Sequence, residues 1–297
     1  MSSLQSKLWE FFLKPLYSQK ARIKDELNIK LARLIVSPFP PVRISRNFSV
    51  ETTQQNGCNI FTVIPKGKAG DKIIFYLHGG AYIAGITWPH WRFIRKLIDK
   101  TGIGAVMVDY PIAPEYGYTD TLDMVLKSYK QLLRHYASSQ IIIMGDSAGG
   151  GLAVAVAQEL KKYNVPLPSR LILLCPWLDV TMSNPDIRMF EKKDSLLSKK
   201  ALIMAGKHYA KGADRTIPEI SPIYGDFDGL PEIHLFIGTH DLLAADARKL
   251  KNRLAKNGAR FFYYEFDNMF HVWMLFPVPE ARKALDKIDE IVKTHIG

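Results

Sequence analysis

The sequence predicts an α/β fold in which helices cover both faces of a mostly parallel sheet. Short runs of apolar, β-branched residues alternate along the chain with longer stretches of helical periodicity. Several of the apolar runs are continuous rather than alternating, as expected of strands that are buried on both faces. With 297 residues, 47% hydrophobic and 23% charged, the chain has the size and composition of a single domain spanning residues 1–297.

The first forty residues differ from the rest and predict two amphipathic helices. Leu8, Phe11 and Phe12 recur at helical spacing, and Pro15 is expected to end or kink this first helix. The second helix is predicted from a repeat of apolar residues and is expected to stop at the prolines at positions 38, 40 and 41. The repeat consists of Ile23, Leu27, Leu31 and Leu34.

The remaining elements follow in regular alternation. Strands are predicted at Ile60–Ile64, Lys72–Leu77, Ala105–Val108, Ile141–Met144, Leu171–Leu174, Ile233–Ile237 and Phe261–Phe266. Helices are predicted at Trp91–Lys100, Thr121–Tyr136, Gly149–Tyr163, Leu242–Lys256 and Pro279–Ile296. Residues 181–211 contain a helical stretch, Ser198–Tyr209, but no strand pattern, so we expect an insertion that lies over the sheet's edge.

The stretch Gly145-Asp146-Ser147-Ala148-Gly149-Gly150 follows a predicted strand and opens a predicted helix of small residues. A serine on so sharp a turn presents its hydroxyl at the carboxyl end of the sheet, where the active sites of such folds lie. Glycines fit this position because the turn is strained and the helix packs close to the strand. Ser147 is therefore the candidate nucleophile. The alternative interpretation of the motif is a glycine-rich turn.

A second motif, His78-Gly79-Gly80-Ala81, directly follows the strand predicted at residues 72–77. Backbone amides that no side chain obstructs can converge here on a developing oxyanion. The amide of Ala148, beside the candidate nucleophile and near a helix N-terminus, is a further donor. We therefore predict an oxyanion hole from Gly79, Gly80, Ala81 and Ala148. We expect His78 to hold the loop rather than to act as the base.

The acid and the base are expected beyond later strands. Asp241 is the first acid after the strand at residues 233–237, whereas its rival Asp246 lies inside a predicted helix. His271 follows the strand at residues 261–266. The order Ser, Asp, His is one that this kind of sheet uses. Because a serine hydroxyl is too weakly acidic to attack unaided, His271 would take its proton and Asp241 would orient the imidazole.

The other histidines fit this role less well. His234 lies within a strand, and His240 adjoins Asp241 too closely to be its partner. Those on or beside predicted helices are expected at the surface, and they are His90, His135, His208 and His295.

In these residues the chain resembles the hormone-sensitive-lipase-like family of α/β-hydrolases, bacterial carboxylesterases in particular. The chain departs from the family pattern at Ala81, where a third glycine is usual, and at Leu242, where proline often follows the acid. The matches lie in family order between about residues 72 and 275, and they are His78-Gly79-Gly80, Tyr110–Glu115, the run from Gly145, Pro176–Asp179, Asp241 and His271.

The resemblance implies the α/β-hydrolase fold with a helical cap built from the N-terminal segment and an insertion before the acid. Residues 1–40 and 181–211 fit that role. Their bulky apolar side chains are expected to close a small acyl pocket over Ser147, which favours short-chain acyl esters. Tyr110–Glu115 and Asp179 are expected to be structural.

Charge and hydropathy limit the kinds of partner that we expect for this protein. The net charge is +11, but the basic residues are scattered and form no arginine-rich stripe, so we expect no nucleic-acid partner. No apolar run approaches the ~18 residues of a membrane span, and no signal peptide is evident. We therefore expect a cytoplasmic protein that acts on a small-molecule ester. The sequence leaves homo-oligomerisation open.

The two cysteines, Cys58 and Cys175, predict neither a disulfide framework nor a zinc site, and Cys175 is expected to be a small buried hydrophobe. No His/Cys/Asp/Glu cluster has metal-ligand spacing and the triad needs no metal, so neither a metal nor a cofactor is expected.

Three alternatives stay open at this point. The same triad serves amidases, lactonases and peptidases, and a relative that has lost catalytic groups can be a non-catalytic binder. The aromatic N-terminal segment could also dock on a membrane surface instead of packing as a cap.

Overall fold

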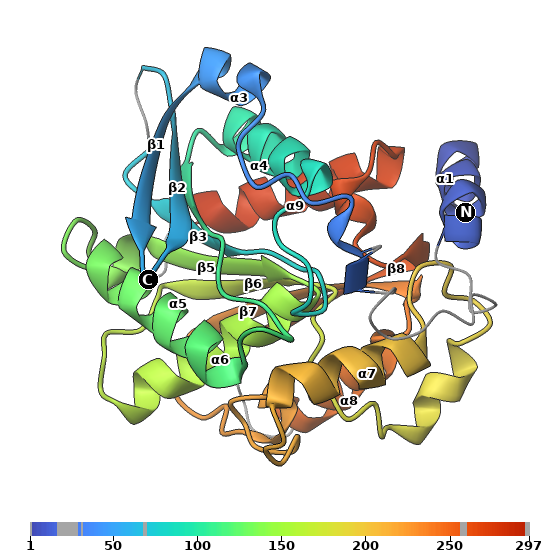
Figure 1. Ribbon diagram of the computed structural model, residues 1–297. Helices are drawn as coiled ribbons and strands as arrows, with labels where there is room; N and C mark the ends of the chain where they lie inside the picture. Colours follow the sequence, from blue (N-terminus) through green and yellow to red (C-terminus); the bar gives the residue numbers. More distant parts are fainter. Residues whose placement is uncertain (1, 17–28, 31, 68–69, 256–259, 295–297) are drawn as a thin grey trace.

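The protein is described here from a computed structural model, which covers residues 2–16, 29–30, 32–67, 70–255 and 260–294 (Figure 1). The described residues form one eight-stranded sheet in the order β1-β2-β4-β3-β5-β6-β7-β8. The strands are β1 (Phe48–Gln55), β2 (Cys58–Pro65), β3 (Ile73–Leu77), β4 (Gly104–Val108), β5 (Ile141–Asp146), β6 (Arg170–Leu174), β7 (Glu232–His240) and β8 (Phe261–Phe270).

The sheet is parallel from β4 through β8 and antiparallel at one edge, where β1 pairs with β2 and β2 pairs with β4. Each of the seven strands predicted from the sequence is present, with bounds that differ by a few residues. Strand β1 was not predicted. Its sequence is mostly polar and only Phe48 is buried, because an edge strand faces solvent and carries no apolar run.

Helices cover both faces of the sheet. Figure 1 shows α4 and α9 together on one face and α5, α6 and α8 on the other. Chain crossovers between parallel strands place them there. The helices are α1 (Leu4–Leu16), α3 (Val42–Asn47), α4 (Trp88–Thr101), α5 (Tyr118–Leu132), α6 (Ala148–Lys162), α7 (Lys199–Ala210), α8 (Ala244–Leu254) and α9 (Pro279–Lys293).

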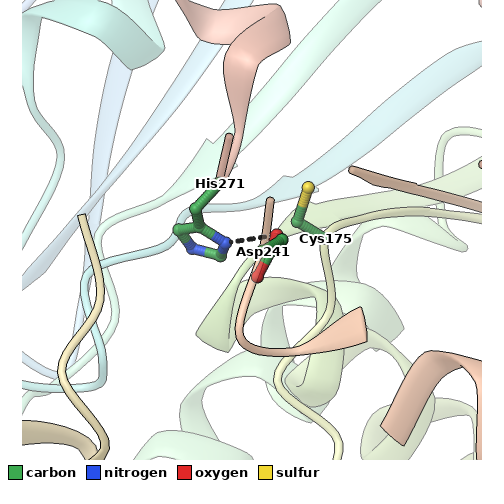
Figure 2. A group of neighbouring side chains, drawn as sticks. All are labelled: Cys175, Asp241 and His271. Atoms are coloured by element: carbon green, nitrogen blue, oxygen red, sulfur yellow. Dashed lines mark hydrogen bonds and ion pairs between the residues drawn. The ribbon is translucent and has the colours of Figure 1, made fainter. Parts of the chain in front are cut away.

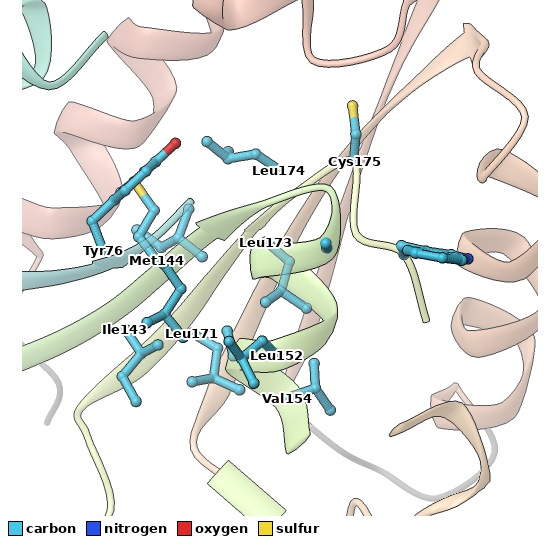
Figure 3. Close-up of a cluster of buried hydrophobic side chains, with 14 of the residues drawn as sticks. Tyr76, Ile143, Met144, Leu152, Val154, Leu171, Leu173, Leu174 and Cys175 are labelled. Atoms are coloured by element: carbon cyan, nitrogen blue, oxygen red, sulfur yellow. The ribbon is translucent and has the colours of Figure 1, made fainter. Parts of the chain in front are cut away.

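The core lies between the sheet and these helices. Figure 3 shows Leu152 and Val154 of α6 among Ile143, Leu171 and Leu173 of strands β5 and β6, all of them fully buried. Small residues on α6 allow it to pack closely on the sheet, which fixes the start of this helix relative to the end of β5.

The N-terminal segment is only partly described. Helix α1 runs through Pro15 and ends at Leu16, so the proline stands in the last turn. The helix expected from residue 23 lies mostly outside the described residues; positions 29, 30, 32 and 33 are helical. Among the described residues, we find no helix with the length and apolar character required to cross a membrane.

Candidate active site

Ser147 stands at the sharp turn between β5 and α6, with backbone angles φ 51° and ψ −119°. This strained conformation is rare for a residue with a side chain, and it aims the hydroxyl away from the sheet. The neighbouring glycine is required by close packing, because a Cβ on Gly149 would lie 2.0 Å from the carbonyl oxygen of Leu77. The local sequence therefore fixes the position of the serine hydroxyl.

The fold brings Ser147, His271 and Asp241 together from the ends of three strands. His271 Nε2 lies 2.9 Å from Ser147 Oγ, and His271 Nδ1 lies 2.8 Å from Asp241 Oδ2. The other carboxylate oxygen, Oδ1, accepts the Leu243 amide at 2.9 Å. Asp241 is fully buried, and the other two side chains are nearly so. The three thus form one continuous hydrogen-bonded chain, as in serine hydrolases.

The electrostatic setting suits His271 for proton transfer. Burial alone would lower its pKa, but the charge and hydrogen bond of Asp241 outweigh burial, and Asp194 and Asp146 add to them. The net effect raises the pKa of His271 above its ordinary value. A raised pKa means that the imidazole is a stronger base toward a hydroxyl proton.

The backbone amides of the glycine loop after β3 have two different roles: one binds Asp146, and two others, unpaired among the described residues, are left for an oxyanion. The Gly79 amide donates to Asp146 Oδ1 at 3.0 Å, so it is not available to an oxyanion, and the expectation for Gly79 is corrected. In the part of the chain that the structure describes, the amides of Gly80, Ala81 and Ala148 have no protein partner. Ala81 has φ 52°, a left-handed conformation in which its methyl group is tolerated.

Asp146 connects this loop to the nucleophile turn. Its Oδ1 accepts the Tyr76 hydroxyl at 2.6 Å, and His90 Nε2 lies 3.3 Å from its Oδ2. Burial would raise the pKa of Asp146, but His90, His78 and the Tyr76 hydroxyl outweigh burial. The pKa of Asp146 is therefore lowered. The expectation that His90 lies at the surface is therefore wrong. Its Nδ1 accepts the Thr87 amide at the start of α4, which turns the ring inward.

His78 occupies a structural position, as expected. Its ring stacks on Tyr110 at 4.1 Å between centroids, and its Nδ1 lies 2.7 Å from the carbonyl oxygen of Gly79. Burial lowers the pKa of His78 to about 4, with the His90 charge acting in the same direction. The Tyr110 hydroxyl in turn donates to the His78 carbonyl, so the motif at residues 110–115 supports the glycine loop.

Comparison with known proteins agrees with this architecture. A model of the alpha/beta hydrolase fold family matches residues 74–275. An esterase of Acinetobacter venetianus is 33% identical over 223 residues, which covers 74% of each chain. A solved esterase of the bacterial hormone-sensitive lipase family has a TM-score of 0.87 at 27% identity, with 100% of both chains covered. The chain belongs to the hormone-sensitive-lipase-like α/β-hydrolases. An acetyl-hydrolase of Streptomyces hygroscopicus is 31% identical over 81% of each chain.

In this hydrolase the insertion packs near the candidate triad rather than at an outer edge of the sheet. Asp194 Oδ2 accepts the Leu242 amide at 2.7 Å, directly beside Asp241. Burial raises the pKa of Asp194 to about 7, and the negative charge of Asp241 adds to this effect. On α7, Tyr209 stacks on Tyr82 of the glycine loop at 3.7 Å between ring centroids. The insertion thus contacts both the acid and the candidate oxyanion loop.

Helix α1 is attached to α9. The Ser3 and Ser6 hydroxyls donate to Glu280 at 2.9 and 2.5 Å, and the Trp9 ring lies 5.6 Å from that of Phe276. The packing is less complete than the amphipathic pattern predicted, since Leu8 is 47% exposed.

Cys175 lies beside the candidate triad, whereas its sequence position predicted only that it would be buried. Figure 2 shows it beside Asp241 and His271, and ligating atoms of the three residues lie within 4.8 Å of one another. The cluster does not fit a resident metal, because His271 Nδ1 is committed to Asp241 in the triad. Only the position of Cys175, directly after a strand of the same sheet as Asp241, could have signalled this contact.

Proposed function

We propose that this protein is a serine carboxylesterase in which Ser147 is the nucleophile, His271 the general base and Asp241 the acid that orients it. That it is a carboxylic ester hydrolase follows from its family and from relatives named esterase and acetyl-hydrolase. The mechanism rests on one observation, the hydrogen-bonded chain from Asp241 through His271 to Ser147, beside three amides that have no partner among the described residues.

The proposed reaction begins when Ser147 Oγ attacks the ester carbonyl carbon and its proton moves to His271 Nε2. The carbonyl electrons collect on the oxygen, which the amides of Gly80, Ala81 and Ala148 would stabilise. When the tetrahedral intermediate collapses, the alcohol leaves with the proton from His271, and an acyl group stays on Ser147. A water molecule then gives its proton to His271 and releases the acid by the same steps.

Labelling with a fluorophosphonate tests the nucleophile. The wild-type protein should be labelled and inactivated, whereas Ser147→Ala should take no label and lose p-nitrophenyl acetate hydrolysis with an unchanged thermal midpoint. A correctly folded Ser147→Ala variant with a substantial share of the wild-type kcat would contradict the assignment.

We further propose a cap, formed by residues 1–40 and 181–211, that limits the acyl group to short chains. Support comes from the contacts of the insertion with Tyr82 and with the backbone next to Asp241. On a series of p-nitrophenyl esters, kcat/KM should be highest for short acyl chains, and deleting residues 1–40 should broaden the preference or cause aggregation. Best activity on long chains would contradict the cap.

Amide, lactone and peptide cleavage by the same triad are the alternatives, and relative rates on matched ester and amide substrates decide among them. A non-catalytic binder would fail to react with the fluorophosphonate. We also propose a cytoplasmic location and no nucleic-acid partner, and we leave homo-oligomerisation to solution measurement.

A further inference from the structure

The surface next to the glycine loop carries an unusual group of exposed apolar side chains. They lie on the segment 34–42, which we call the strap, and on the first residue of α4. The exposed fractions are 78% for Leu34, 53% for Ile35, 63% for Phe39, 68% for Val42 and 57% for Trp88. Soluble monomers rarely expose so many large apolar groups together unless the surface has a partner.

The strap is fixed in place along the beginning of α4. Val36 forms a β-bridge with Thr87, and the Ser37 amide donates to the Ile86 carbonyl at 2.7 Å. The Trp91 indole donates to the Ser37 carbonyl at 2.8 Å. These bonds align the strap with residues 86–91, and Figure 1 shows the chain passing α4 on its way to α3. The exposed groups therefore belong to an ordered surface.

The two chain segments that form this surface carry basic residues, and the acid beside them, Glu115, is paired with Arg33. No Asp or Glu occurs between residues 27 and 50 or between residues 72 and 98. Two arginines of α3, Arg43 and Arg46, are exposed and form no ion pair among the described residues. On α4, Arg92 and Lys96 follow Trp88 at intervals of four residues and therefore lie on the same side of the helix, whereas Arg95 pairs with Asp99.

We propose that the strap and the start of α4 dock the enzyme onto an anionic lipid surface. The apolar side chains would enter the boundary between headgroups and acyl chains, while the arginines contact the anionic headgroups. A second copy of the chain is a poorer partner, because a twofold interface would bring the same basic groups face to face.

Docking there would bring the active site near the membrane. The side chain of Arg33, the residue before the strap, donates to the Ile83 carbonyl at 2.9 Å and so links the strap to the loop that carries Gly80 and Ala81. An ester that partitions into the bilayer would thus be concentrated beside the candidate oxyanion hole. This inference goes beyond the proposed function, since binding to lipid does not require that the chemistry be correct.

Co-sedimentation with vesicles tests the proposal. The full-length protein should bind vesicles that contain phosphatidylserine, bind pure phosphatidylcholine weakly, and lose binding at high salt. The double variants Val42→Ser/Trp88→Ser and Arg43→Glu/Arg46→Glu should each weaken partitioning on the order of tenfold or more. The matched controls are Lys130→Glu/Arg134→Glu, at the end of α5 and in the turn after it on the opposite face of the sheet, and the exposed Tyr163→Ser; both should bind normally.

Fluorescence gives a second, local readout. Brominated lipids should quench part of the tryptophan emission of the wild-type protein, and the quenching should largely disappear in Trp88→Phe. Hydrolysis of a soluble p-nitrophenyl ester should be unchanged in every variant, which separates this proposal from the proposed function. Absence of binding to anionic vesicles, or equal losses in the variants and the controls, would overturn it. So would a stable dimer that Val42→Ser/Trp88→Ser dissociates.

Cys175 carries a second inference on independent grounds. It follows β6 in a left-handed conformation, φ 49°, and it is fully buried. Its Sγ accepts the Val272 amide, directly after His271, at 3.3 Å. Burial raises the pKa of the thiol well above its ordinary value, and the charge of Asp241 adds to this. The sulfur therefore keeps its proton, and it lies within 4.8 Å of a carboxylate oxygen of Asp241.

We infer that Cys175 is a positioning residue that holds the carboxylate and the peptide after His271 in their working orientation. Cys175→Ala should lower kcat about tenfold with little change in KM, the effect of one lost hydrogen bond of ordinary strength. Without the thiol donor, Asp241 interacts more strongly with protonated His271, so the acid limb of the kcat–pH profile should move to higher pH. Cys175→Ser keeps a donor and an acceptor and should restore both quantities.

Cys58→Ser is the matched control, because Cys58 lies on β2, away from the triad, and should leave kcat and the pH profile unchanged. An Ala variant with wild-type kcat and pH profile would overturn the inference. So would equal losses in the Ser and Ala variants accompanied by equal drops in thermal midpoint, which would indicate packing alone.

Discussion

Replacing Asp241 by asparagine is the sharpest test of the candidate triad. The carboxylate accepts hydrogen bonds from His271 Nδ1 at 2.8 Å and from the Leu243 amide at 2.9 Å. An asparagine has only one acceptor oxygen. If that oxygen stays with the Leu243 amide, the new NH2 group faces Nδ1 and forces the imidazole proton onto Nε2. An imidazole in that tautomer cannot take the proton of Ser147.

The expected magnitude follows from this loss. A wrong tautomer with intact geometry lowers kcat by roughly 10⁴ in the serine protease precedent, or about 5.4 kcal/mol of transition-state stabilisation. We expect Asp241→Asn to lower kcat/KM on p-nitrophenyl acetate by this order. Because the two residues act as a unit, Asp241→Asn combined with His271→Ala should cost little more than His271→Ala alone.

The neighbouring carboxylate provides the matched control. Asp246 is equally buried, but it accepts the Asn184 side chain at 2.9 Å and does not contact the imidazole. Asp246→Asn should keep most of the activity. The reasoning is refuted if Asp246→Asn is the more damaging change, if Asp241→Asn retains activity with an unchanged fold, or if the two losses in the double variant multiply.

Three further outcomes follow from the same geometry. The pKa of His271 is raised and the base must be neutral, so kcat/KM should fall as the pH decreases. The apparent pKa of this fall should lie above the ordinary histidine value of about 6.5. A fall in kcat/KM centred well below that value would contradict the assignment. Gly79→Ala should lower both kcat and the thermal midpoint, since the added Cβ would lie 2.3 Å from Asp146 Oδ2, and an unchanged variant would show that the loop has room. Activity should survive dialysis against EDTA, because side chains supply the nucleophile and the base; a loss that a divalent ion restores would count against the serine mechanism.

The sequence predicted the parallel strands because a buried parallel strand is a continuous apolar run. It also predicted Ser147, Asp241 and His271, because each follows such a strand and therefore lies at the same edge of the sheet. It did not predict β1, whose polar residues face solvent. The prediction that His90 lies at the surface was wrong for a different reason. Residue periodicity places a histidine on a helix, but it does not show that a capping hydrogen bond turns the ring inward.

The same limit explains why Gly79 was assigned to the oxyanion hole. A glycine motif predicts free backbone amides, but it does not show which of them the protein itself uses. Here Asp146, the residue before the candidate nucleophile, accepts the Gly79 amide and the Tyr76 hydroxyl and contacts His90. Its lowered pKa keeps it a carboxylate, which accepts all of these bonds at neutral pH. The turn that presents Ser147 and the loop that presents Gly80 and Ala81 are therefore joined through one buried charge. A nucleophile and an oxyanion hole must keep a fixed separation to stabilise one tetrahedral intermediate, and this connection provides it.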